Sequence, residues 1–240
     1  MNVALAAAAT LVASAFALST LDRWLRRRRA HDLAWTVSLA LFAAGAAALW
    51  WAESAGWSLG AFRVFYLAGA ILNVPWLALG TVYLLADRRI ADRVRGWLIL
   101  LSGFAAGVVL FAPTRSGGTS ATGDELPTGK EVFGVAPRVL AAVGSGVAAL
   151  IIVAGALWSV WRPRRAGIQS SRLVLGNVLI AAGTLILSAS GTLAGRLGKD
   201  RAFAITLLIG ICVLFAGFLV ATGKNSEKRP AQQLAADVAR

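Results

Sequence analysis

Three residues near the middle of one long apolar stretch have side chains suited to holding a ligand: Asn73, Pro75 and Trp76. A proline inside a helix leaves the carbonyl four residues earlier without its donor and bends the helix, here near Ile71. The freed carbonyl needs another donor, and we expect Asn73 or a water molecule to supply it. A bend, an amide and an indole ring together can line a small pocket with a polar centre.

The same residues also have a plainer interpretation, which is helix packing. Asn73 would then hydrogen-bond a neighbouring helix, an interaction worth roughly 1 kcal/mol, while Trp76 fills space. We favour this packing interpretation and keep ligand binding as the alternative. Thr184, inside a later apolar stretch, is a further polar candidate, so the predicted ligand-binding residues are Asn73, Pro75, Trp76 and Thr184.

The long apolar stretches contain no Asp, Glu, Lys, Arg or His. Ionisable side chains inside a bilayer usually mark proton relays, ion paths or counter-ions. The single histidine, His31, falls in a predicted loop beside Arg29 and Asp32, which excludes a haem held by two histidines, a His-ligated metal centre and a Ser–His protease. No lysine lies near Ile211 in the last stretch, where a retinal Schiff base would need one. We expect no catalytic residue, no cofactor and no metal, and we disfavour a proton-driven transporter.

The overall composition indicates a protein that lies in lipid. Of the 240 residues, 58% are hydrophobic and only 15% are charged, against about 25% charged in a typical soluble domain. The formal net charge of +13 would suggest nucleic acid in a soluble protein. Here the arginines form short clusters between apolar stretches, as in cytoplasmic loops, so we expect no nucleic-acid partner. The single cysteine, Cys212, cannot form an intrachain disulfide and is expected to be a small buried side chain.

A bilayer core about 30 Å thick requires about 20 apolar residues in helical conformation. Seven stretches qualify or come close, which predicts an all-α, polytopic transmembrane bundle of seven helices over residues 1–222 and a polar cytoplasmic tail over 223–240. The predicted spans are 2–21, 33–51, 64–85, 97–112, 139–160, 173–195 and 202–222.

The first apolar stretch has a second interpretation, a cleaved signal peptide, because Ala13-Ser14-Ala15 fits the small-residue cleavage pattern. No Lys or Arg precedes the stretch, although a signal peptide has a basic segment there. Four consecutive arginines, Arg26 to Arg29, follow it closely, and translocating them would violate the positive-inside rule. We therefore favour a retained helix.

Basic residues are distributed unequally between the two sides of the predicted bundle. One side holds 17 of the 24 Lys and Arg residues and the other holds 7. Because cytoplasmic loops retain Lys and Arg, the N-terminus is predicted to lie outside and the C-terminus in the cytoplasm. The cytoplasmic Arg clusters should bind anionic lipid headgroups at about 1 kcal/mol per residue.

Small residues recur at four-residue spacing and predict close helix packing. We expect packing within the chain first and a homodimer or another membrane-protein partner second. The pairs are Gly103/Gly107 and Gly191/Gly195, with Ala141/Ser145 and Gly144/Ala148 as further cases.

The longest predicted loop, 113–138, lies on the external side of the bundle. Its first half is rich in Gly, Ser and Thr. Its second half, around Phe133 and Val135, is a candidate to fold back as a lid or to contact a partner.

The stretch from Tyr66 to Leu85, with the chain's Ala-, Arg- and Gly-rich usage, resembles multi-pass membrane proteins of high-GC actinobacterial genomes. The resemblance implies the cytoplasmic membrane and no particular activity. Two functions therefore stay open. One is a non-catalytic seven-helix binding or accessory subunit that holds a lipid-like ligand or a membrane partner. The other is a facilitator for a neutral or amphipathic solute working around the Pro75 bend. The absence of ionisable residues favours the first, and an enzyme that uses its interfacial loops is a weaker third.

Overall fold

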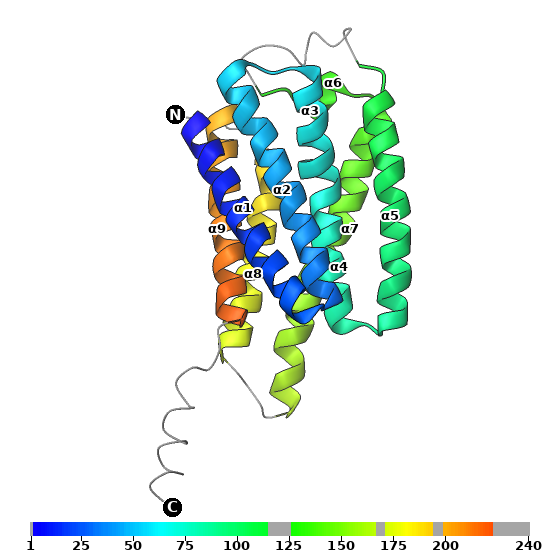
Figure 1. Ribbon diagram of the computed structural model, residues 1–240, viewed down its shortest axis with the longest axis vertical. Coiled ribbons are helices and arrows are strands. Elements are labelled where there is room, and N and C mark those ends of the chain that lie inside the picture. Colours follow the sequence, from blue (N-terminus) through cyan, green and yellow to red (C-terminus); the bar gives the residue numbers. More distant parts are fainter. Residues whose placement is uncertain (1, 115–125, 167–170, 194–198, 223–240) are drawn as a thin grey trace, which may run out of the picture.

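A computed structural model describes residues 2–114, 126–166, 171–193 and 199–222, and these are helical almost throughout (Figure 1). The predicted tail 223–240 lies outside the described residues. The elements are α1 (Asn2–Arg27), α2 (Ala30–Ala55), α3 (Leu59–Phe65), the π-helix η1 (Tyr66–Leu72), α4 (Asn73–Leu85), α5 (Arg88–Phe111), α6 (Gly129–Val132), α7 (Val135–Ala166), α8 (Ser171–Leu193) and α9 (Lys199–Thr222).

Six of the described helical segments are long and apolar enough to cross a membrane. They are α1, α2, the continuous run α3–η1–α4, α5, α7 and α9. In α8 the described apolar part, Val178–Leu187, is shorter than a span. The prediction of an all-helical, multi-pass architecture is thus confirmed, while the seventh crossing and the orientation stay predictions.

Long helices that follow one another in the chain run in opposite directions, so their connections lie at two ends of the bundle (Figure 1). We call one the basic end, because it holds the α1–α2 turn at Arg28–Arg29 and the basic start of α5. The other is the capped end, which holds the α2–α3 turn and the short helix α6. Helix α5 stands at the periphery and contacts α4 and α7, while α1 packs on α2 and α9.

Helix α1 buries a stripe of mostly small residues with helical spacing, Ala6, Ala9, Ala13 and Phe16, each at most 1% exposed. The small residues let α1 approach α2 and α9 closely. The Phe16 ring lies 4.5 Å from the ring of Phe215 and 4.8 Å from that of Phe218, both on α9.

Glycines on α8 and α9 bring these two helices together. A Cβ on Gly217 would lie 2.8 Å from the backbone N of Ile180, and one on Gly183 would lie 2.7 Å from that of Leu214. The glycines on each helix are seven residues apart, which places them on one face. They are Gly176 and Gly183 on α8, and Gly210 and Gly217 on α9. Cys212 is exposed on α9, so the expectation that it is buried was wrong.

The predicted packing glycines of α5, unlike the glycines of α8 and α9, do not lie against another described helix. No heavy atom outside the local helix backbone lies within 4 Å of a Cβ built on Gly103 or Gly107, so neither brings another described helix close. A packing role for them requires a partner outside this chain and stays a prediction. The side-chain surroundings of Gly191, and all of Gly195, lie outside the described residues.

Candidate functional site

The segment before Pro75 is a π-helix rather than a simple bend. The Asn73 N–H donates to the carbonyl of Ala68, five residues back. In this register the carbonyl of Ala70 faces Pro75, which has no N–H to donate. The hydroxyl of Ser145 on α7 donates to that carbonyl instead, at 2.6 Å. The expected replacement donor was Asn73 or a water, and the structure provides a serine from a neighbouring helix.

Gly144 and Ala148, predicted as a small-residue pair, lie on the same helix as Ser145. A Cβ on Gly144 would lie 3.9 Å from both the Ile71 carbonyl oxygen and the Pro75 ring, and Ala148 is 3% exposed. The small residues of α7 therefore pack against η1 and the start of α4.

Asn73 is 8% exposed and joins α4 to α2. The Ser38 hydroxyl donates to the Asn73 carbonyl at 2.9 Å and lies 3.4 Å from its side-chain oxygen. Nearby, a Cβ on Gly45 would lie 3.2 Å from the Cα of Gly69, so α2 and η1 approach closely. Asn73 thus contacts a neighbouring helix, as the packing interpretation expects, but the shorter hydrogen bond is to its backbone carbonyl and not to its amide side chain.

Trp76 and Thr184 point to different neighbours. The Trp76 indole N–H donates to the Ser102 hydroxyl at 3.2 Å, which connects α4 to α5. Thr184 is 2% exposed, and its hydroxyl donates to the carbonyl of Ile180 in its own helix at 2.8 Å. Helix α8 packs on α9 and α7, so Thr184 lies on a different part of the bundle from Asn73 and Pro75. Ligand binding by the four predicted residues stays a prediction.

At the basic end, the structure places two residues of the predicted loop on a helix. Helix α2 begins at Ala30, so His31 and Asp32 lie in its first turn. The Asp32 side chain is 0% exposed, and Nη2 of Arg23 on α1 donates to its Oδ1 at 3.1 Å. His31 Nε2 lies 3.7 Å from the same oxygen. The placement of Asp32 and His31 outside the helices was therefore wrong, and the bundle does contain a buried ionisable group.

The same charged pair also contacts α9. The Arg23 guanidinium lies 4.6 Å from the centre of the Phe218 ring, so its charge also faces an aromatic surface. Three further atoms of the pair are buried and have no hydrogen-bond partner among the described residues: Arg23 Nε, Arg23 Nη1 and Asp32 Oδ2. We refer to Arg23, Asp32 and Phe218 as the charged clasp, because they join α1, α2 and α9.

At the capped end, the described second part of the predicted 113–138 loop folds back over the bundle. Thr128 and Glu131 form a reciprocal capping box that starts α6. Phe133, which follows α6, is 0% exposed, and its ring lies 5.5 Å from that of Phe62 and 5.2 Å from that of Tyr66. The expected fold-back is thus confirmed for Phe133. Val135 is 66% exposed and takes no part in it.

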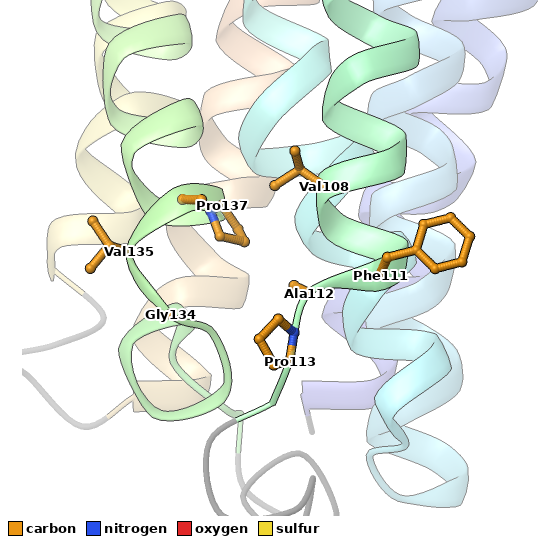
Figure 2. A pocket seen from close by; sticks show the side chains of 8 residues that line it. Val108, Phe111, Ala112, Pro113, Gly134, Val135 and Pro137 are labelled. Carbon is orange, nitrogen blue, oxygen red and sulfur yellow. The ribbon is translucent and has the colours of Figure 1, made fainter.

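Beside this cap lies an apolar pocket of about 310 Å³ between the end of α5 and the start of α7 (Figure 2). In Figure 2, Val108, Ala112, Pro113 and Pro137 surround the hollow, while the Phe111 ring points away from it. No charged or hydroxyl side chain lines it, so its walls suit hydrocarbon. The lining residues are Val108, Phe111, Ala112, Pro113, Gly134, Val135, Ala136 and Pro137.

Two arginines flank the pocket. Arg63, predicted in the 52–63 loop, lies on α3, and its Nη2 donates to the carbonyl of the pocket residue Ala112 at 3.1 Å. Its Nε is buried, and no described residue accepts a hydrogen bond from it. Arg138 directly follows the pocket residue Pro137 in the first turn of α7. Neither arginine forms an ion pair with a described carboxylate.

Sequence reasoning missed both the charged clasp and the pocket. Apolar stretches were ended at the first charge, which removed Arg23, Asp32 and Arg63 from the spans. The signal that could have found them is the presence of isolated charges within one turn of a long apolar helix. Among the described residues, no three His, Cys, Asp or Glu side chains gather closely enough to ligate a metal. No protein-family model, curated protein or solved structure matches the chain.

Proposed function

We propose that the chain is a non-catalytic, seven-helix protein of the cytoplasmic membrane that binds a lipid-like molecule at its capped end. The N-terminus would lie outside, because 17 of the 24 basic residues fall on the opposite side of the predicted spans from the 113–138 loop. The capped end then faces the outer leaflet. We base the ligand assignment on one observation, the apolar pocket between α5 and α7.

The position of the pocket supports a lipid-like ligand. Helices α5 and α7 are the least buried of the six membrane-type helices, so a space between them lies next to lipid tails. The volume of about 310 Å³ is at the lower end of the 300–1,000 Å³ typical of small-molecule sites. It therefore suits a single hydrocarbon chain. The predicted centre at Asn73 is less suited, because Ser38 and Ser145 already donate to the backbone carbonyls of Asn73 and Ala70 there.

A photoactivatable dodecanol tests the pocket, because it has a tail and an uncharged head. In the purified protein in neutral detergent, we expect its adducts to concentrate in 108–113 and 134–137. Val108→Trp fills the pocket and should remove most of these adducts. Leu100→Trp, on the same helix at a position that is 65% exposed, is the matched control and should leave them. Adducts spread evenly over the exposed apolar faces, unchanged by Val108→Trp, would refute the proposed site.

The orientation is tested by cysteine labelling in whole cells. Ser54 lies at the end of α2 next to the capped end, and Asp87 lies in the α4–α5 turn at the basic end. In a Cys212→Ala background, Ser54→Cys should react with a membrane-impermeant maleimide and Asp87→Cys should react only after permeabilisation. The reverse pattern would place the pocket in the inner leaflet.

The alternative is a facilitator for a neutral or amphipathic solute. The π-helix before Pro75 favours it, because π-helical turns are frequent at functional sites. Flux of such a solute in proteoliposomes that is lost in Pro75→Ala would support this alternative over simple binding.

Two partner assignments accompany the proposal. Anionic lipid headgroups would bind the arginines of the basic end. A membrane protein or a second copy of the chain would cover the α5 face that carries Gly103 and Gly107. Crosslinking in native membranes tests the second assignment.

A further inference from the structure

We infer that His31 is a proton-binding site, and that a proton bound there loosens the charged clasp at the basic end. The inference goes beyond the proposed function, because it concerns the opposite end of the bundle from the pocket. It is carried by the position of the imidazole ring beside the buried carboxylate of Asp32 and the ring of Trp35. Since the proposed orientation places the basic end in the cytoplasm, this site would respond to cytoplasmic pH.

His31 lies against the carboxylate of the clasp. Its Nε2 is 3.7 Å from Oδ1 of Asp32, which is longer than a hydrogen bond. The same oxygen accepts from Nη2 of Arg23 at 3.1 Å. The His31 side chain is 16% exposed, whereas that of Asp32 is 0% exposed. A proton from water can therefore reach the imidazole, which in turn lies next to the buried charge.

His31 is also connected to α9 through aromatic rings. Its ring lies 5.3 Å from that of Trp35, and the Trp35 ring lies 5.9 Å from that of Phe218 on α9. The Arg23 guanidinium contacts the same Phe218 ring at 4.6 Å. A change at the imidazole is therefore felt by the carboxylate that joins α1 to α2 and by the rings that pack on α9.

The neutral form of His31 fits this cluster better than the charged form. With His31 neutral, the charges of Arg23 and Asp32 balance each other. A proton on His31 brings a second cation to a carboxylate that Arg23 already contacts, and it adds repulsion from Arg23 and Arg29. Most of the ring is removed from water, so the charged form also loses solvation. The imidazolium and the Arg23 guanidinium therefore compete for one carboxylate.

Among the described groups of this cluster, His31 is the one that ordinarily changes charge near neutral pH. The charged groups that face it come from its own helix, from α1 and from the turn between them, namely Asp32, Arg23 and Arg29. Helices α9 and α4 contribute uncharged residues that contact Trp35, namely Phe218 and Gly80. Arginine keeps its charge, and aspartate ordinarily titrates near about pH 4. A pH response near neutrality therefore belongs to His31.

Acid should weaken the bundle through this site. The folded protein takes a proton at His31 less readily than the unfolded chain does, so stability is lost as the pH falls through about 6.5, where histidine ordinarily titrates. The full chain in neutral detergent is unfolded with sodium dodecyl sulfate at about pH 7.5 and about pH 5.5. We expect the equilibrium constant for unfolding to be about fivefold larger at the lower pH, out of a maximum of about elevenfold for one such histidine.

Two variants assign this response to His31. His31→Gln is neutral at both pH values and should remove the difference between them. Asp22→Asn is the matched control, because Asp22 is an exposed carboxylate on α1 at the same end, paired with Arg26. It should keep the fivefold difference. An unfolding constant that does not change with pH, or a change that persists in His31→Gln, overturns the inference.

Arg23→Met separates competition for Asp32 from simple burial of a histidine. Without Arg23, a proton on His31 supplies the buried carboxylate with a cation, so the sign reverses and acid should stabilise this variant. A histidine that is merely buried would still destabilise the variant in acid. That result would overturn the competition and the inference with it.

The protonation state can also be read directly, even where a variant fails to fold. His31 is the single histidine of the chain, so isotope-labelled histidine gives the resonances of one ring. At about pH 6.5, where an ordinary histidine is half protonated, we expect the folded protein to keep mostly the neutral form. An equal protonated fraction in the folded protein and the unfolded chain overturns the inference.

Discussion

The two ends of the bundle place their arginines in opposite settings. At the basic end, Arg23 meets a fully buried carboxylate, Asp32, and an aromatic ring, Phe218, and three helices are joined. At the capped end, neither Arg63 nor Arg138 forms an ion pair with a described carboxylate. The apolar pocket between α5 and α7 lies at the same end. The difference teaches that a buried charge pair joins three helices at the basic end, whereas at the capped end Arg63 joins α3 to the end of α5 through a backbone carbonyl.

The physical cost of the two arrangements explains why they differ. A carboxylate taken fully out of water loses several kcal/mol of solvation and stays ionised only beside a positive partner. The basic end must therefore keep Arg23 and Asp32 together. At the capped end Arg63 and Arg138 are partly exposed, so they lose less solvation than a fully buried charge would.

The largest expected effect is on the charged clasp. Asp32→Ala leaves the partly buried Arg23 unpaired and should reduce the free energy of unfolding by about 3–5 kcal/mol. The measurement is unfolding in mixed detergent and sodium dodecyl sulfate, followed by circular dichroism. Asp22→Ala breaks an exposed pair with Arg26 on the same helix and should cost less than about 1 kcal/mol.

Replacing both charges sharpens this test. Arg23→Met combined with Asp32→Leu removes the desolvation cost along with the attraction, and should recover most of the stability lost in Asp32→Ala. If Asp32→Ala and Asp22→Ala reduce the free energy of unfolding equally, the buried Arg23–Asp32 pair does not stabilise the basic end more than an exposed pair does.

The cap at the other end relies on an aromatic side chain. Phe133→Ala removes a ring that is 0% exposed and contacts Phe62 and Tyr66, so we expect a loss of about 3 kcal/mol in the free energy of unfolding. Phe104→Ala, at a position that is 61% exposed on α5, is the control and should have little effect. A loss as small as that of Phe104→Ala would mean that the cap does not stabilise the capped end.

The smallest effect is expected midway between the two ends. Ser145→Ala leaves the Ala70 carbonyl without a donor and should cost about 1 kcal/mol. In a Pro75→Ala background residue 75 has an N–H for that carbonyl, so the cost of Ser145→Ala should largely disappear. The double-mutant cycle is measured by the same unfolding assay. If the losses in free energy of unfolding of the two single variants add up in the double variant, the Ser145 hydroxyl does not replace the N–H that Pro75 lacks.

Much of the architecture was predictable, because span length and the absence of charge are local properties. Each of the six membrane-type helices contains one of the predicted stretches, except that 97–112 ends one residue past α5. The errors lie at the helix ends. His31, Asp32 and Arg63 were assigned to loops because an apolar stretch was ended at its first charge, whereas the backbone stays helical as long as its hydrogen bonds are made.

The rotation of each helix about its axis was much harder to predict. In water, a helix reveals its buried face by its apolar side chains. In lipid, the exposed face is as apolar as the core, so this signal is lost. The four-residue spacing of Gly103 and Gly107 therefore did not show which face of α5 packs, and Gly183 on α8 and Gly217 on α9 were not singled out from the sequence. The structure leaves the first pair open and places the second pair against a neighbouring backbone.

The sequence by itself determined that this chain forms a multi-pass helical bundle, since hydropathy and length are read along one helix at a time. Only the tertiary structure decided which polar groups meet. Two pairs, Arg23–Asp32 and Ser145–Ala70, join different helices, and Arg63–Ala112 joins α3 to the residue that follows α5. Their distances depend on how far each helix extends and how it is rotated, and packing between helices sets both.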